Sequence, residues 1–219
     1  MSFNRIDWVQ IGYAALDTLA MLGGALFFTV LFGLPLGVLL FLTGRGQLLQ
    51  QGAVYAALSF VLNILRSVPF IILLIVLMPV TTLLTGTSLG VRGVIPPLVV
   101  GTTAFFARLV ETALREVDRG VIEASQAMGG TIRQIVFHAL LPEALPGILA
   151  GITVTAIVLV DYTAMSGAIG GGGIGDLAIR YGYQRFQTEV MIVTVLLLIV
   201  LVQMLQAGGN RLVQHFSRK

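Results

Sequence analysis

The sequence is dominated by apolar runs that are longer than a soluble domain can bury. The run Thr18–Leu42 carries no charge, and a membrane-spanning helix needs about 20 predominantly apolar residues. Charged residues make up only 11% of the chain, against about 25% in soluble domains. We therefore expect an all-α integral membrane protein in which residues 1–219 form a single transmembrane domain.

Five apolar segments are expected to cross the membrane. They are Thr18–Leu42, a span within Ala53–Leu84, Val94–Leu114, Ile148–Ala164 and Glu189–Gln206. Pro35 is compatible with the first span, because neighbouring helices and water can satisfy the freed backbone groups. The second segment is too long for one straight crossing and is interrupted by Arg66-Ser67-Val68-Pro69. We expect Ala53–Leu65 to begin at the membrane interface and Pro69–Leu84 to cross.

Basic residues predict which connectors face the cytoplasm, where lysine and arginine are enriched. One side holds seven of them, Arg45, Arg115, Arg119, Arg133, Arg211, Arg218 and Lys219, and the other side holds Arg5, Arg92, Arg180 and Arg185. The excess predicts a cytoplasmic C-terminus and, with an odd number of spans, Met1 outside. The net charge of +3 is spread over short loops, which indicates a protein in contact with membrane lipid and not with nucleic acid.

The connector at about residues 115–147 is much longer than a link between two spans needs to be. Long connectors with helix signals of their own are usually functional. Asp118 can cap a first short helix, which Gly129-Gly130 ends. Ala124, Ala127 and Met128 share one face of this helix, and the small residues there allow another protein to approach closely.

A second short helix is expected after the two glycines. Thr131 caps it, and Gln134 three residues later completes a capping box. Pro142 is expected to end this helix, before Pro146 and the fourth span. Composition alone also allows an amphipathic helix that lies on the membrane surface. Apolar residues recur at helical spacing along this segment: Ile132, Ile135, Val136, Ala139 and Leu140.

The spacing of Glu123-Ala124-Ser125, Gly129 and Leu141-Pro142 resembles the EAA loop of ABC-importer permeases. Ser125 stands where that loop has a second Ala, and Ala139 stands where it has Ile. The resemblance implies a cytoplasmic coupling helix that docks into a separate ATPase subunit. The residues implied to couple the two subunits are Glu123, Ala124, Ser125, Ala127, Met128, Gly129, Leu141 and Pro142.

Nearly the whole chain is similar to the permease subunit of methionine ABC importers. The segments that carry the similarity are Arg66–Leu73, Leu141–Gly147, Thr163–Gly170 and Asp176–Tyr183. It implies the type I ABC importer permease fold and a homodimer in the bacterial cytoplasmic (inner) membrane. It also implies two ATPase subunits, an extracytoplasmic lipid-anchored methionine-binding protein, and alternating access driven through Val121–His138.

The glycine-rich run Gly170–Gly175 matches G-x-G-x-x-G, but it follows an apolar span and no buried strand, so it is not a nucleotide fingerprint. A P-loop needs a Lys beside Ser or Thr, and the only Lys is Lys219. We expect no cofactor in this chain, with ATP and Mg on the partner ATPase. The run is either an extracytoplasmic loop or a close-packed segment. His138 and His215 lack a third residue at ligand spacing, so no metal site is expected.

Candidate pathway residues interrupt or end the spans: Arg66, Ser67, Pro69, Asp161, Met165, Ser166 and Gly167. We single out Arg66, Arg108 and Asp161 as ionisable residues near or within spans, where charges usually face the bundle interior or its ends. An ion pair of Asp161 with Arg66, Arg108 or Arg180 is possible. Met165 is a candidate gate, although ordinary packing accounts for it equally well.

Three other functions stay open at this point. The first is an ABC permease for another amino acid. The second is an ion-coupled secondary transporter, which favours an inverted repeat, whereas the sequence has no internal repeat. The third is a structural membrane scaffold. Co-purification with an ATPase distinguishes the first from the other two.

Overall fold

Helices account for every regular element in residues 7–217, the part of the chain that the computed structural model describes. Met1, Arg5, Arg218 and Lys219, which entered the charge argument, lie outside these residues. The elements are α1 (Trp8–Thr43), α2 (Gly52–Ser67), α3 (Phe70–Thr85), α4 (Gly90–Arg115), α5 (Arg119–Ala127), α6 (Ile132–Ile135), the π-helical turn η2 (Val136–Leu140), α7 (Leu141–Ser166), the 3₁₀ turn η3 (Gly167–Ile169), α8 (Gly173–Leu177), the π-helical turn η4 (Ala178–Tyr183) and α9 (Thr188–Ser217). The expected all-α fold is confirmed.

Four helical stretches in the described residues are long and apolar enough to cross a membrane, and the bent pair α2–α3 makes a fifth candidate span. The first stretch begins at Trp8, upstream of the expected start at Thr18. Asp7 caps it, because its Oδ1 accepts hydrogen bonds from the backbone N–H groups of Val9 and Gln10 at 3.0 and 3.1 Å. Ile11 in this added length is buried, so the early turns belong to the folded bundle.

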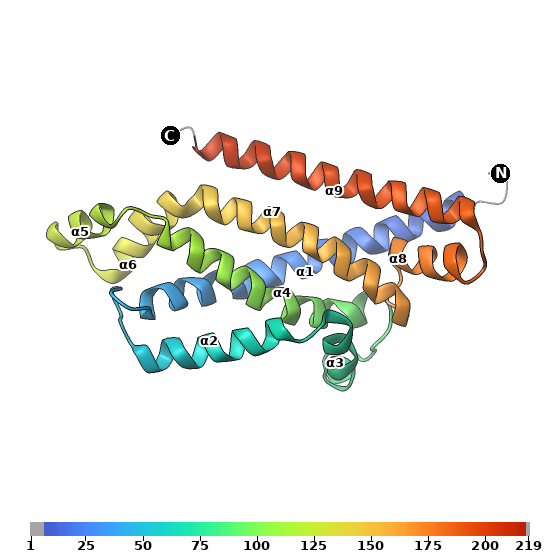
Figure 1. Ribbon diagram of the computed structural model, residues 1–219, viewed down its shortest axis with the longest axis horizontal. Helices are drawn as coiled ribbons and strands as arrows, with labels where there is room; N and C mark the ends of the chain where they lie inside the picture. The colour runs from blue at the N-terminus through green and yellow to red at the C-terminus, as the bar shows by residue number, and fades with distance from the viewer. Residues whose placement is uncertain (1–6, 218–219) are drawn as a thin grey trace.

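The second candidate span differs from the expectation, because it is α2 that runs along the bundle beside α4 while α3 turns across it (Figure 1). The two helices meet at an angle of 107°. Val68 is extended and Pro69 precedes the first turn of α3. A residue before proline is driven out of the helical region, so the chain bends at this dipeptide. The expectation that Ala53–Leu65 only begins at the interface is therefore wrong.

The bundle is held together by close approach of α1 to α4. A Cβ added at Gly37 would lie 2.5 Å from the Cβ of Val110, so the two backbones meet where no side chain fits between them. The hydroxyl groups of Thr29 and Thr102 join the same helices through a buried hydrogen bond of 2.7 Å. Small residues and buried hydroxyl pairs are typical of helix contacts within membranes.

The two ends of the bundle carry different elements (Figure 1). The short helices α5 and α6, the α1–α2 connection and the end of α9 lie at one end, and the start of α1, α8 and the α3–α4 connection lie at the other. The basic residues expected on the cytoplasmic side, among those described, belong to elements of the first end. That this end faces the cytoplasm stays a prediction.

Candidate functional site

Helix α5 presents the Glu-Ala-Ser segment on the outside of the bundle. Its N-terminus is capped by Asp118, whose Oδ1 accepts a hydrogen bond of 2.6 Å from the N–H of Gly120, as expected. Ile122 is the one buried residue of the helix and packs into the core beside Ile135. A single apolar anchor with exposed residues around it leaves the rest of the helix free to contact another protein.

Gly129 and Gly130 end α5 through a Schellman motif, which confirms the expected break. Gly129 has φ +78°, and its N–H donates to the carbonyl of Gln126, while the N–H of Gly130 donates to that of Ser125. Thr131 then caps α6: its hydroxyl accepts from the N–H of Gln134, and the Gln134 side chain accepts from the N–H of Thr131 at 2.9 Å. The expected capping box is therefore present.

Pro142 does not end this second helix, contrary to the expectation. The chain stays helical from Ile132 through η2 into α7, and Pro142 lies in the first turn of α7. In η2 the N–H of Leu141 donates to the carbonyl of Val136, five residues back. Proline has no N–H to donate and its ring crowds the turn before it, and the wider π-helical turn lies at that place. Leu141 is half-buried and Pro142 exposed.

Most of the expected coupling residues form an exposed surface at the end of the bundle. Glu123, Ala124, Ala127 and Gly129 are exposed, Ser125 is half-buried, and Met128 is 82% exposed. An exposed methionine beside alanines is suited to an adaptable protein contact. A groove of about 460 Å³ runs between the two short helices, lined by Ser125, Met128, Gly129, Gly130, Gln134, Ile135, His138 and Ala139.

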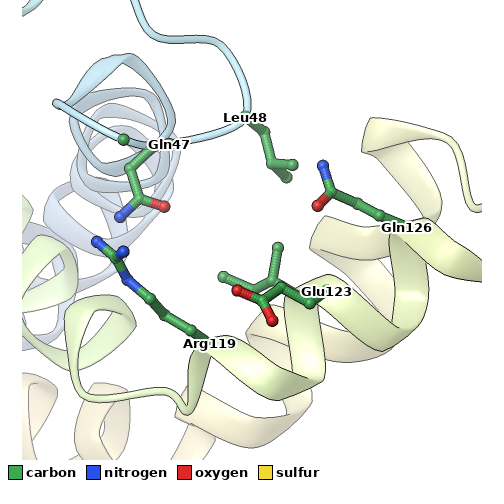
Figure 2. A pocket seen from close by; sticks show the side chains of 7 residues that line it. Gln47, Leu48, Arg119, Glu123 and Gln126 are labelled. Atoms are coloured by element: carbon green, nitrogen blue, oxygen red, sulfur yellow. The ribbon is translucent and has the colours of Figure 1, made fainter.

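A second, polar hollow of about 250 Å³ lies on the other side of α5. Figure 2 shows Arg119, Glu123 and Gln126 from α5 and Gln47 from the α1–α2 connection converging on it. Nothing in the sequence connects residues 46–48 with the segment around Glu123. They become part of the same surface only because the two connectors fold against each other at one end of the bundle.

The expected pathway residues of the second span lie at the α2–α3 bend. Arg66, Ser67 and Pro69 are exposed there, and the guanidinium carbon of Arg66 lies 5.8 Å from the ring centre of Phe105. The rings of Phe70 and Tyr162 stack nearby with their centres 4.1 Å apart. Arg66 and the three aromatic rings line, with neighbouring residues, a small hollow of about 160 Å³ between α2, α3, α4 and α7.

The pathway residues expected in and after the fourth span divide into two groups. Asp161 and Met165 are exposed, whereas Ser166 and Gly167 are buried. Among the described residues Asp161 forms no ion pair, because Arg108 pairs with Glu111 and Arg180 pairs with Asp176. The possible partners of Asp161 named from the sequence are thus either engaged elsewhere or, for Arg66, placed against Phe105.

The glycine-rich run is a close-packed segment and not an open loop. A Cβ on Gly167 would lie 2.6 Å from the carbonyl carbon of Gly175, so only glycine allows these backbones to touch. Gly173 has φ +79°, and the buried hydroxyl of Thr18 accepts a hydrogen bond of 2.9 Å from the N–H of Ile174. The run therefore packs α8 closely against α1.

A charged pair follows this segment at the end of the bundle opposite α5. The guanidinium of Arg180 donates to the carboxylate of Asp176, which is buried. That hydrogen bond is the main cause of the raised pKa of Arg180, while partial burial acts in the opposite direction. The Tyr181 ring contacts Arg185, whose guanidinium carbon lies 4.5 Å from the ring centre, and its hydroxyl accepts a 3.0 Å hydrogen bond from Gln10.

Glu111, inside the third expected span, was missed as a candidate. It is 4% exposed, and its carboxylate accepts hydrogen bonds from Arg108 and Arg115 at 2.7 Å each and from Tyr55 at 3.1 Å. The available signal was its spacing from the two arginines, three residues before and four after. A carboxylate flanked in this way on one helix face can be neutralised inside a membrane protein.

Comparisons with known proteins agree with this arrangement. Residues 33–219 match the model of the family described as binding-protein-dependent transport system inner membrane component. The chain is 46% identical over 227 residues to the probable D-methionine transport system permease protein of Vibrio cholerae, with 100% of both proteins covered. It is 43% identical over 217 residues to the methionine import system permease protein of Bacillus subtilis, with 99% of this chain and 98% of that protein covered.

A solved structure has the same fold. It is a chain of the MetNI methionine ABC transporter in inward-facing conformations, which superposes with a TM-score of 0.95 at 44% sequence identity and 99% coverage of both chains. The family match and the relatives extend over nearly all of the chain and include the exposed Glu123 surface and the bundle that carries it. The chain therefore belongs to the family of binding-protein-dependent transport system inner membrane components.

Proposed function

We propose that this chain is the permease subunit of an ATP-driven methionine importer in the bacterial cytoplasmic membrane. The observation that carries the proposal is the exposed α5 surface, built on one buried anchor and closed by a Schellman break, in a chain with methionine permease relatives. An amphipathic helix on the membrane surface would turn its apolar face to lipid, whereas Ile135, Val136 and Leu140 are buried in the core.

The mechanism that suits this surface is alternating access by a dimer of this chain with two ATPase subunits. ATP binding brings the ATPase subunits together, and the α5 surface moves with them. Ile122 and Ile135 pack in one core cluster with residues of α1, α4 and α7, so displacement of α5 is transmitted to the long helices. An ATPase can drive this change only if its contacts differ between the two states.

The remaining partners are inferred from the missing P-loop lysine and from the methionine transport of the relatives. The only Lys is Lys219, so a P-loop is impossible here, and ATP and Mg belong on the ATPase subunit. An extracytoplasmic, lipid-anchored binding protein delivers methionine to the end that carries α8. The likeness to a transporter chain in inward-facing conformations supports an inward-facing state for the arrangement in Figure 1.

The test is reconstitution of the whole system in proteoliposomes with the ATPase and the binding protein. We expect ATP-dependent uptake of radiolabelled methionine that unlabelled methionine suppresses and other amino acids leave unchanged. Suppression by a different amino acid would reassign the substrate. Uptake that needs an ion gradient and no ATP, with no ATPase co-purifying, would refute the importer.

A further inference from the structure

A polar cluster around the buried carboxylate of Glu111 joins α2 to α4 near the end of the bundle that carries α5. Glu111 of α4 accepts hydrogen bonds from Arg108, Arg115 and Tyr55, and only Tyr55 belongs to α2. The guanidinium of Arg108 also reaches α2, where it donates to the carbonyl of Ser59 at 3.3 Å and to the side chain of Asn63 at 3.2 Å. We call these six residues the Glu111 cluster.

The apolar contacts of α2 with the bundle are few: Leu62 packs against α1 and α4, and Leu58 and Leu65 are partly buried beside it. Of its 16 residues only Leu62 is buried, and exposed apolar side chains such as Phe60 and Val61 cover its outer surface. In a membrane, exposed apolar surface gains nothing by leaving lipid, so helix association depends on close packing and on hydrogen bonds. The three bonds that cross from α4 to α2 are therefore a large share of what fixes α2.

The cluster also lies between two regions that the proposed transport cycle must link. Arg115 is the last residue of α4, and α5 begins only four residues later at Arg119. In the other direction α2 leads from Tyr55 to the bend at Arg66–Pro69 and into α3. A rigid connection at Glu111 makes α2 follow the end of α4, and the end of α4 follows α5.

Resting on the proposed function, we infer that Glu111 is a positioning residue that carries the motion of the ATPase-docking surface to α2 and its bend. A carboxylate is needed because it accepts from Arg108, Arg115 and Tyr55 together and neutralises part of the charge of the two arginines. Gln at this position offers one acceptor oxygen and leaves both cations without a counter-ion in the cluster. The bond from Tyr55 of α2 is then weakened, and Arg108, which reaches Ser59 and Asn63 of α2, loses the carboxylate that orients it.

The test compares Glu111→Gln with Glu116→Gln, a control on the next turn whose side chain is exposed and forms no ion pair among the described residues. The full complex is reconstituted, and methionine taken up per ATP hydrolysed is measured. We expect this ratio to fall about tenfold in Glu111→Gln, the factor that corresponds to one charge-assisted hydrogen bond. In Glu116→Gln it stays unchanged.

A second measurement separates positioning from a general loss of stability and does not depend on the substrate. The chain contains no Cys, so two spin labels can be placed on Cys introduced together, in one copy of the chain, at the exposed residues Ala56 of α2 and Gln126 of α5. In the parent complex we expect one narrow distance distribution that is the same with ADP and with trapped ATP. In Glu111→Gln we expect a broad distribution.

Tyr55→Phe removes one hydrogen bond between α2 and Glu111 and leaves the ion pairs in place. This variant should lower the transport ratio less than Glu111→Gln does. The double variant should have the same ratio as Glu111→Gln. If Glu111→Gln fails to assemble, the ratio and the distance distribution of Tyr55→Phe test the inference instead. An unchanged ratio with a narrow distribution in the variants overturns the inference. A parent complex without methionine uptake would instead count against the proposed function, and the distance measurements would still test the cluster.

Discussion

The backbone conformation of Gly129 shapes the α5 surface that we propose docks on the ATPase. Its φ of +78° lies in the left-handed region, and both bonds of the Schellman motif depend on it. A Cβ added here would meet no atom of residues 7–217 within 4 Å. Within this subunit, glycine is required because of its left-handed backbone conformation. A partner that docks against Gly129 would add a second, steric requirement.

We expect Gly129→Val to lower methionine uptake by the assembled transporter by about tenfold, because a β-branched residue resists the left-handed conformation by about 1–2 kcal/mol. Gly129→Asn should remain close to the parent, since Asn tolerates this conformation. Uptake and stimulated ATPase activity are measured with matched amounts of subunit. Equal activity of the two variants would show that the turn angle does not matter for coupling.

Glu123 tests the same surface through charge. It is exposed and forms no ion pair with any described residue, so its removal should leave the stability of this chain unchanged. An exposed ion pair with a partner contributes about 0–1 kcal/mol. We therefore expect Glu123→Ala to reduce uptake by less than about fivefold, with normal thermal unfolding. A lower unfolding temperature would mean that Glu123 stabilises the fold of this subunit and does not act through contact with the ATPase.

At the scale of elements, the contact between α1 and α4 requires glycine at position 37. A Cβ on Gly37 would lie 2.6 Å from the carbonyl oxygen of Ala107 as well as against Val110. Gly23, on the same helix, is exposed and has no atom within 4 Å of the added Cβ. Substitution of Gly37 by Ala therefore changes helix packing as well as helix propensity, whereas substitution of Gly23 changes only helix propensity.

Gly37→Ala should destabilise the purified subunit by about 1–3 kcal/mol, the usual cost of forcing extra atoms into a packed site. Gly23→Ala should be neutral or slightly stabilising, because Ala is a better helix former than Gly. Thermal unfolding in detergent, followed by circular dichroism, measures both. If the two variants unfold at the same temperature, α1 and α4 have room to separate and do not form a tight contact.

At the scale of the whole molecule, the placement of the two ends relative to the membrane decides which partners each surface meets. The exposed residues Gln126 and Gln184 lie at opposite ends of the bundle, in α5 and just before α9. Because the chain has no Cys, Cys introduced at either position is the only thiol present. An impermeant thiol reagent added to intact cells should label Gln184→Cys and leave Gln126→Cys unlabelled. The reverse pattern would remove α5 from contact with a cytoplasmic ATPase.

The division of labour between subunits is also a property of the whole molecule. Since this chain has no lysine at a P-loop, the purified subunit alone should hydrolyse no ATP. Hydrolysis should appear when the separate ATPase subunit is added. Sustained hydrolysis by the isolated chain, free of contaminating ATPases, would contradict the assignment of ATP to the partner.

The sequence alone predicted the features that depend on neighbouring residues. The number of candidate spans follows from the lengths of the apolar runs. The caps at Asp118 and Thr131 and the break at Gly129 follow from hydrogen bonds within a few residues of each cap. These interactions are local, so the residues that make them can be predicted from the sequence. The segment around Glu123 is expected to be exposed because its helices are too short and too polar to lie inside the bundle.

Only the tertiary structure decided which distant residues meet. In the folded chain α2 lies along the bundle and α3 lies across it. The helix continues past Pro142, and the glycine-rich run packs against α1. It also joined residues 46–48 to the coupling surface and Tyr55 to Glu111. A bend at a proline is predictable, but its direction is set by the packing of helices far apart in sequence. Likewise, a buried carboxylate is stable only once its hydrogen-bond donors from another helix are in place.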